Sequence, residues 1–146
     1  MHLAVYRTRP EVRAVVHAHP PVATAFAVCR RAMDVPYIAE LVLGLGTVPV
    51  TAGFAMPSTD QVTESMRPFI PAHNAVLLAN HGLVCWGESL LQAFDRLETV
   101  EHVGKILLNA QALGGAVALT EEETNGLLSL RGIYRELGKK REEERA

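Results

Sequence analysis

The sequence predicts an α/β sandwich, in which helices cover a small central sheet. Short runs of β-branched and apolar residues alternate along the chain with longer runs of helical periodicity. The run NAVLLAN at 74–80 is the clearest strand signal, and SLLQAFDRLETVEHVGKILLNAQALGG at 89–115 is the longest helical pattern. These patterns do not decide whether the strands run parallel or antiparallel.

The first two predicted elements are a helix and a strand. HLAVYRTR at 2–9 has the pattern of the last turns of an amphipathic helix, with arginines where the helix dipole favours them. VRAVVHAH at 12–19 is β-branched and apolar, which predicts a buried strand. Because the helix is entered so close to its end, we expect that an N-terminal segment is missing from this chain.

The next stretch is less regular. Pro20 and Pro21 end the strand and can occupy the first turn of a helix, so VATAFAVCRRAM at 22–33 is predicted to be helical. The glycines of ELVLGLG favour a loop or a short strand across 34–47. TVPV at 47–50 is predicted to be a short strand, and the TAGFAMPS that follows it a loop.

STDQVTESMRPFI at 58–70 is predicted to be a helix, because Ser58 and Thr59 are good cap candidates. His81-Gly82 forms a bend after the strand at 74–80, and LVCWG at 83–87 is a second strand.

Two helices complete the order. Ser89 is a cap candidate for the long helix, and Gly114-Gly115 ends it. TEEETNGLLSLRGIYREL opens with a capping box at Thr120 and Glu123 and is predicted to be the final helix, although its glycines argue against continuity. KKREEERA at 139–146 is predicted to be a solvated, charged tail.

Composition limits the function classes. The 146 residues form a single predicted domain, 1–146, with 49% hydrophobic and 21% charged residues, as in ordinary soluble proteins. A formal charge of −2 argues against a nucleic-acid partner, and no apolar run reaches the roughly 18 residues that a membrane span needs. Cys29 and Cys85 lack metal or redox spacing. We therefore expect a cytoplasmic protein.

The candidate metal site begins with VVHAHPP at 15–21. Side chains on a strand repeat every two residues, so His17 and His19 share one face of the predicted strand. Two such imidazoles can converge on one cation, at about 2.0–2.1 Å per nitrogen. An H-x-H pair alone is equally consistent with two histidines that are each satisfied by a hydrogen bond.

His81 is the third candidate ligand. It follows a strongly apolar strand and precedes Gly82, which lets the backbone turn beside an ion. Three protein ligands with open positions are typical of a catalytic zinc site. The remaining histidines, His2, His73 and His102, lie in the ragged start, a polar loop and a helix surface, where a direct role is not expected.

These motifs carry a family resemblance. VYRTRPEVRAVVHAHPPVATAFA, VPV, PSTDQV and AVLLANHGLVCWGESLLQAFDRLETVEHVGKILLNAQALGG closely resemble the class II aldolase/adducin family, particularly its L-fuculose-phosphate aldolase branch. The resemblance covers residues 2 to about 115 and extends more loosely to Tyr134. It implies a class II aldolase-like three-layer sandwich with a central, mostly antiparallel sheet, N-terminally truncated here.

The resemblance also implies a chemistry. His17, His19 and His81 match the histidines that hold Zn2+, or another divalent metal such as Mn2+ or Co2+. The implied reaction cleaves a ketose phosphate such as L-fuculose 1-phosphate to dihydroxyacetone phosphate and an aldehyde, with the metal stabilising the enediolate. The expected partners are this sugar phosphate and further copies of the chain, in a homotetramer with active sites between subunits.

The chain departs from the family in its acid/base groups. The family's catalytic glutamate and phosphate-binding loops would align before Met1, so no phosphate-binding residue is expected in this chain. A family tyrosine that acts as an acid from the neighbouring subunit would fall near 37–40. Tyr37 is close, but the local alignment favours Glu40, which becomes the candidate catalytic residue. We expect the activity of the shortened chain to be impaired.

Three hypotheses therefore remain open. The first is a metal-dependent sugar-phosphate aldolase. The second is an epimerase or dehydratase of the same family that uses the same three histidines with different acid/base partners. The third is a non-catalytic, adducin-like module for metal binding and oligomerisation, although adducin-like members have lost the histidines that this chain retains.

Overall fold

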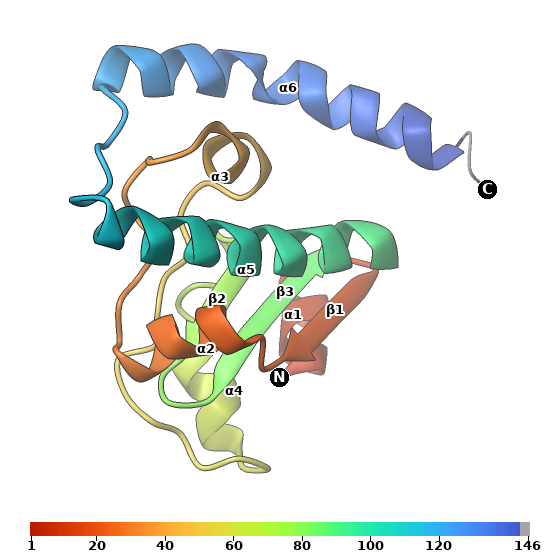
Figure 1. Ribbon diagram of the computed structural model, residues 1–146. Helices are drawn as coiled ribbons and strands as arrows, with labels where there is room; N and C mark the ends of the chain where they lie inside the picture. Colours follow the sequence, from red (N-terminus) through yellow and green to blue (C-terminus); the bar gives the residue numbers. More distant parts are fainter. Residues whose placement is uncertain (144–146) are drawn as a thin grey trace.

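The computed structural model describes residues 1–143, and beyond residue 133 it describes the side chains of residues 136 and 137 alone. Helices lie on both faces of a three-stranded antiparallel sheet, which makes three layers (Figure 1). The strands are β1 (Ala14–Ala18), β2 (Ala75–Leu78) and β3 (Gly82–Gly87), with β3 in the centre. The predicted fold class is confirmed, and the sheet is antiparallel, as the resemblance implies.

Alternate side chains of the sheet enter two separate cores. Leu77, Leu83 and Cys85 point into one hydrophobic cluster, whereas Val84 and Trp86 point into the other. Strands that are apolar on both faces are expected where a sheet is covered on both sides. This explains why NAVLLAN and LVCWG have continuous apolar runs rather than an alternation of apolar and polar residues.

The helices divide between these cores. The first core contains residues of α2 (Pro21–Val28), α3 (Ala39–Gly44) and α5 (Leu90–Ala112). The second contains residues of α1 (His2–Thr8) and α4 (Asp60–Met66). The last helix, α6 (Glu121–Glu143), lies across α3, and Arg131 Nε donates to the Leu43 carbonyl oxygen there at 3.2 Å (Figure 1).

The predicted helix starts at the polar caps are confirmed. The Thr59 hydroxyl accepts from Gln61 N at the start of α4, and the Ser89 hydroxyl accepts from Gln92 N at the start of α5. At the start of α6, the Glu123 carboxylate accepts from Thr120 N at 2.8 Å, while Glu123 N donates to the Thr120 hydroxyl at 3.2 Å. These reciprocal bonds form the predicted capping box.

The prediction for 34–47 was wrong, because this stretch contains the short helix α3. No side chain caps α3 at Ile38, and Gly44 is its last residue, so local sequence signals are weak. The helix instead buries Leu41 and Val42, and tertiary packing outweighs its poor propensity. The predicted strand at 47–50 is also wrong in extent: Val48 and Val50 form isolated bridges to Met33 and Leu77, without a continuous strand.

Three predicted helix ends also differ from the structure. The helix predicted over 58–70 ends at Met66. The helix predicted over 22–33 ends at Val28, and Arg30 just beyond it has a left-handed φ of 52°. The final helix passes through its glycines and continues to Glu143, so part of the predicted tail is helical in its backbone. The rest of that tail, residues 144–146, lies outside the described residues.

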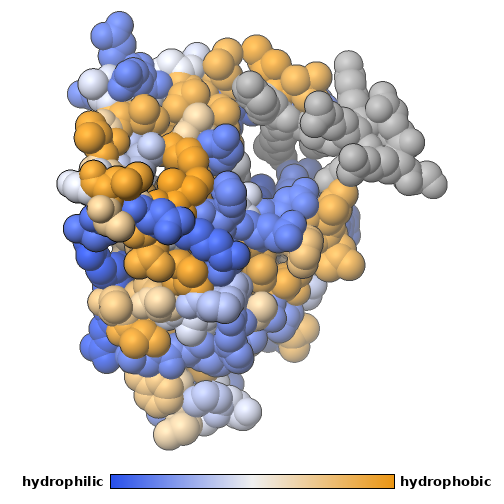
Figure 2. Space-filling model, in the orientation of Figure 1, coloured by the Kyte–Doolittle hydropathy of each residue, from blue (hydrophilic) through white to orange (hydrophobic). Residues whose placement is uncertain are grey.

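The surface retains exposed apolar side chains on α6. Leu130, Ile133 and Leu137 are all exposed, and their spacing places them on one side of the helix. Figure 2 shows hydrophobic and hydrophilic residues mixed along the top of the view, where α6 lies. Among the described residues, no helix is both long and apolar enough to cross a membrane.

The core provides a stability test. Leu77 of β2 is fully buried in the core that includes residues of α5. Leu77→Ala should therefore lower the free energy of unfolding by about 2–5 kcal/mol. Leu113→Ala removes the same atoms from a side chain that is 88% exposed. This substitution should change the free energy of unfolding by less than about 0.5 kcal/mol. Urea denaturation measures both, and equal losses would contradict the assigned core.

Candidate metal centre

The pairing of β1 with β3 brings distant histidines to one end of the sheet. Ala18 pairs with Leu83, and the register continues so that His19 lies beside Gly82. His17 lies near the end of β1 and His19 directly follows that strand, whereas His81 immediately precedes the start of β3. Because the strands are antiparallel, the end of one lies next to the beginning of the other.

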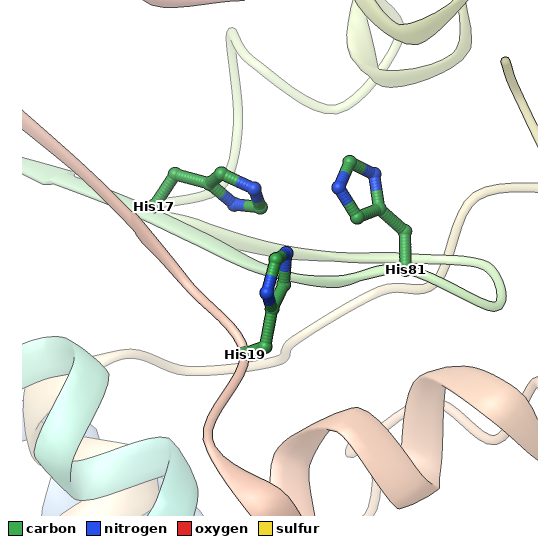
Figure 3. Close-up of side chains that lie close together, drawn as sticks. All are labelled: His17, His19 and His81. Carbon is green, nitrogen blue, oxygen red and sulfur yellow. The ribbon is translucent and has the colours of Figure 1, made fainter. Parts of the chain in front are cut away.

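The three imidazoles face a common point. Their ring centroids are 4.9 Å apart for His17 and His19, 4.9 Å for His17 and His81, and 5.1 Å for His19 and His81. One nitrogen from each ring lies within 4.8 Å of the other two. Figure 3 shows the rings converging from two segments of the chain.

His17 has its ring fixed by a hydrogen bond. Its Nδ1 lies 2.9 Å from the carbonyl oxygen of Leu83 on the neighbouring strand. A carbonyl only accepts, so this contact places the proton on Nδ1 and leaves the Nε2 lone pair free. Metal-binding histidines typically have this arrangement, in which the second nitrogen donates to a backbone carbonyl.

His81 lies in a tight turn. His81 N donates to the Leu78 carbonyl oxygen at 3.0 Å, and Asn80 between them has a left-handed φ of 56°. Asparagine tolerates this conformation better than most residues. Asn80 is held from the α2 side, where its backbone N donates to the Ala27 carbonyl oxygen and its side-chain oxygen accepts from Arg30 Nη2 at 3.3 Å.

His19 is exposed, and its ring makes no hydrogen bond within the described part of the chain. It packs closely on Gly82. A Cβ at Gly82 would lie 2.4 Å from His19 Cδ2 and 2.7 Å from the Ala18 carbonyl oxygen. Only glycine leaves His19 room at this position, which gives the His-Gly pair at 81–82 a steric purpose.

The surroundings favour neutral imidazoles. Burial lowers the pKa of His17 and outweighs the hydrogen bond to Leu83, which acts in the opposite direction, while His81 and His19 lower it further. Burial also lowers the pKa of His81, with a smaller contribution from His19. Since a metal binds the unprotonated ring, these shifts leave the ligand lone pairs available at neutral pH.

The donor set fits a divalent metal ion of the zinc type. Imidazole nitrogen is a preferred ligand of Zn2+ and of several other transition metals. Three histidines with an exposed side leave further positions for water or substrate, as catalytic sites require. His17, His19 and His81, the candidate ligands of the sequence, are therefore the residues that could hold a metal ion.

The other candidate residues lie elsewhere. Glu40 is exposed in the first turn of α3 and lines a cavity of about 870 Å³ whose wall includes Gly87, at the opposite end of β3 from the histidines. Tyr37 precedes α3. His102 is exposed on α5, and His73 contacts Thr47. Within one chain, the structure does not bring Glu40 to the three histidines.

Sequence reasoning missed the role of Glu101. This residue is only 8% exposed, and its carboxylate accepts hydrogen bonds from the backbone at the start of α2. The available signal was its spacing: Leu97, Val100 and Gly104 are buried on the same helix, and positions 97, 100, 101 and 104 share a face. A glutamate on the inner face of a helix needs a buried partner.

Known proteins are similar to this chain in sequence and in fold. Residues 1–108 match the model of the Class II Aldolase and Adducin N-terminal domain. The chain therefore belongs to the class II aldolase/adducin family.

Individual relatives differ in their reactions. The 3-oxo-tetronate 4-phosphate decarboxylase of Escherichia coli K12 is 33% identical over 111 residues, which are 73% of this chain and 51% of that protein. The 5-deoxy-D-ribulose 1-phosphate aldolase of Bacillus thuringiensis serovar kurstaki is 30% identical over 127 residues, covering 87% and 59% of the two chains.

A solved structure of an L-fuculose 1-phosphate aldolase superposes with a TM-score of 0.78 at 32% identity, over 88% of this chain and 59% of that one. The chain thus spans about half the length of the curated relatives that it matches, at 51%, 51% and 50% for three decarboxylases.

The contact of His19 with Gly82 generates a test. Gly82→Ala should weaken Zn2+ binding by about tenfold or more, because the methyl group forces His19 or the strand to shift, and geometric misplacement of ligands is costly. Gly53→Ala is the matched control, since a Cβ there meets nothing within 4 Å. Competition with a chromophoric chelator measures both affinities; unchanged binding in Gly82→Ala would exclude the steric role.

The lowered pKa values predict a pH dependence. In metal-free protein, His17 and His81 should titrate below the usual histidine value of about 6.5, which NMR of the imidazole protons can follow. The unfolded chain then binds more protons near that pH, so folding stability should fall as the pH drops through it. Titration of His17 above the usual value would contradict its desolvated position.

Proposed function

We propose that this chain supplies the metal-binding part of a divalent-metal-dependent lyase acting on a small phosphorylated sugar or sugar acid. The observation that carries the proposal is the convergence of His17, His19 and His81 at one end of the sheet. Two of these ligands come from one strand and the third from a distant turn. A structural histidine cluster would gain nothing from three lone pairs directed at one another.

The cation would supply Lewis-acid stabilisation of the negative charge that develops on a substrate ketone oxygen. The role of the protein is to hold three neutral ligands, because histidines, unlike carboxylates, leave the full positive charge of the ion for the substrate. Burial of His17 and His81 maintains this neutral state.

The favoured reaction is aldol cleavage of a ketose phosphate such as L-fuculose 1-phosphate, giving dihydroxyacetone phosphate and an aldehyde. The match to an L-fuculose 1-phosphate aldolase over most of this chain supports it. In such a cleavage, the electrons of the broken carbon–carbon bond stay on the carbon next to the ketone. The hydroxyl on the other carbon of that bond loses its proton as it becomes the aldehyde oxygen, and the ketone fragment becomes dihydroxyacetone phosphate when its carbon takes up a proton.

Decarboxylation is the second candidate, and the 33% identity to a 3-oxo-tetronate 4-phosphate decarboxylase supports it. A 3-oxo acid that loses carbon dioxide also leaves its bonding electrons on the carbon next to the ketone. For a four-carbon acid with a 4-phosphate, the remaining fragment is again the precursor of dihydroxyacetone phosphate. The two reactions thus place the same demand on the three histidines and differ in the group that leaves.

Proton transfer also requires an acid/base group, and Glu40 is the candidate for it among the described residues of this chain. Glu40 can serve only if another copy presents it, since it lies at the other end of β3 in its own chain. We therefore propose a homo-oligomer with sites between subunits, a tetramer in the first instance. The exposed apolar side chains of α6 are consistent with contacts between copies.

Metal content and turnover test the proposal together. We expect about one divalent ion per chain, and its loss in a variant with all three histidines changed to alanine. Supplied with Zn2+, Mn2+ or Co2+, the protein should release dihydroxyacetone phosphate from one of the two substrates, with lactaldehyde or carbon dioxide identifying the reaction.

We expect slow turnover, because a site without its general base loses about 10²–10⁴-fold in rate. If the unmutated protein binds no stoichiometric divalent metal, both the proposed aldol cleavage and the proposed decarboxylation are excluded. Mixing Glu40→Gln chains with His17→Ala chains tests the intersubunit site, since activity above that of either variant requires two copies to share one site.

A further inference from the structure

The positions of His19 and His81 both depend on their backbones, whereas the ring of His17 is fixed by a hydrogen bond. The ring of His17 is held by Leu83, and His81 is held within its turn. The ring of His19 makes no hydrogen bond among the described residues, and it is exposed. Whatever fixes the backbone after His19 therefore fixes this ligand.

The chain leaves His19 through two prolines. The ring of a proline locks its own φ, and the residue before a proline is confined to extended conformations. Pro20 is extended, with φ −61° and ψ 137°, and Pro21 is the first residue of α2. Few torsions remain free between the start of α2 and His19, so a displacement of this helix end moves the ligand.

The start of α2 is tied to α5 by Glu101. No side chain of its own segment caps α2. Glu101 Oε2 instead accepts from Val22 N at 3.0 Å and from Ala23 N at 2.8 Å. The carboxylate is an effective acceptor for these free N–H groups, because the N-terminus of a helix favours negative charge.

The packing around this contact is tight. Gly104 lies three residues after Glu101 on α5. A Cβ at this position would lie 3.0 Å from Val22 Cγ1. The other carboxylate oxygen, Oε1, has no hydrogen-bond partner among the described residues, although Lys105 Nζ lies 3.4 Å away. Glu101 thus accepts from the two backbone groups of α2 through Oε2 and forms an ion pair with Lys105 through Oε1.

We propose that Glu101 is a positioning residue for the metal centre: by capping α2 from α5, it holds the Pro20-Pro21 segment and so keeps His19 in ligand position. This inference rests on the proposed metal site. According to this inference, Glu101 contributes to the metal affinity although none of its groups is directed at the metal.

The test compares variants that keep or remove the acceptor. Glu101→Gln retains an oxygen that can accept both N–H groups, whereas Glu101→Leu has a similar size and no acceptor. The probes are Zn2+ affinity by chelator competition and the visible spectrum of bound Co2+, which reports ligand number and geometry. Glu98→Leu is the control on the exposed side of α5, and Leu41→Ala, in a buried site on α3, is the control for lost stability.

We expect Glu101→Leu to weaken Zn2+ binding by about tenfold or more and to alter the Co2+ spectrum, and Glu101→Gln to remain within about threefold of the native protein. Both controls should keep the native spectrum. If Glu101→Leu does not fold, Glu101→Asp replaces it: the shorter carboxylate keeps the charge but not the reach, and should bind more weakly than Glu101→Gln.

Three outcomes would overturn the proposal. One is native affinity and spectrum in Glu101→Leu or Glu101→Asp. Another is an equal loss in Leu41→Ala at equal destabilisation, which would make the effect one of global stability. The third is a loss in Glu101→Gln as large as in Glu101→Leu, which would assign the effect to charge. Failure of the native protein to bind Zn2+ would instead refute the proposed function itself.

Discussion

The register between β1 and β3 is the constraint on which the candidate site depends. Pairing Ala18 with Leu83 sets the end of one strand beside the start of the other, and with them His17, His19 and His81. A shift by one residue would turn every side chain of β1 to the opposite face. Because alternate residues of the sheet enter two different cores, such a shift would move each side chain of β1 into the core on the other face and turn His17 away from His81. The packing of the two cores therefore also determines the geometry of the candidate ligands.

A different local interaction positions each candidate ligand. A carbonyl of the central strand fixes the ring of His17, a turn with left-handed Asn80 fixes His81, and two prolines connect His19 to a helix that Glu101 caps. All three contacts lie within or directly beside β1, β3 and α2, which suits a site that must hold a cation with little rearrangement. Three neutral ligands would leave the charge of a bound ion for a substrate, a requirement shared by the two proposed reactions, aldol cleavage and decarboxylation of a 3-oxo acid.

Most elements and the individual candidate ligands could be predicted because their signals are local, whereas the assignment of His81 to one site with His17 and His19 came from the family resemblance. The H-x-H spacing, the turn at His81-Gly82 and the caps at Thr59, Ser89 and Thr120 depend on residues a few positions apart. The helix at Ala39–Gly44 was missed because it forms by burying Leu41 and Val42 against distant segments, against its own weak propensity. The same holds for Glu101, whose partners Val22 and Ala23 are about eighty residues away: the sequence marks it as inward-facing, and only the fold identifies what it binds.

X-ray absorption at the zinc edge of the metal-loaded protein tests the central claim most directly. Three imidazoles on one ion predict three nitrogen scatterers at about 2.0–2.1 Å, with the outer-shell pattern of histidine rings and the remaining positions taken by oxygen. A spectrum with one or two imidazoles, or one dominated by sulfur from Cys29, would show that the three rings do not share an ion and would contradict the account.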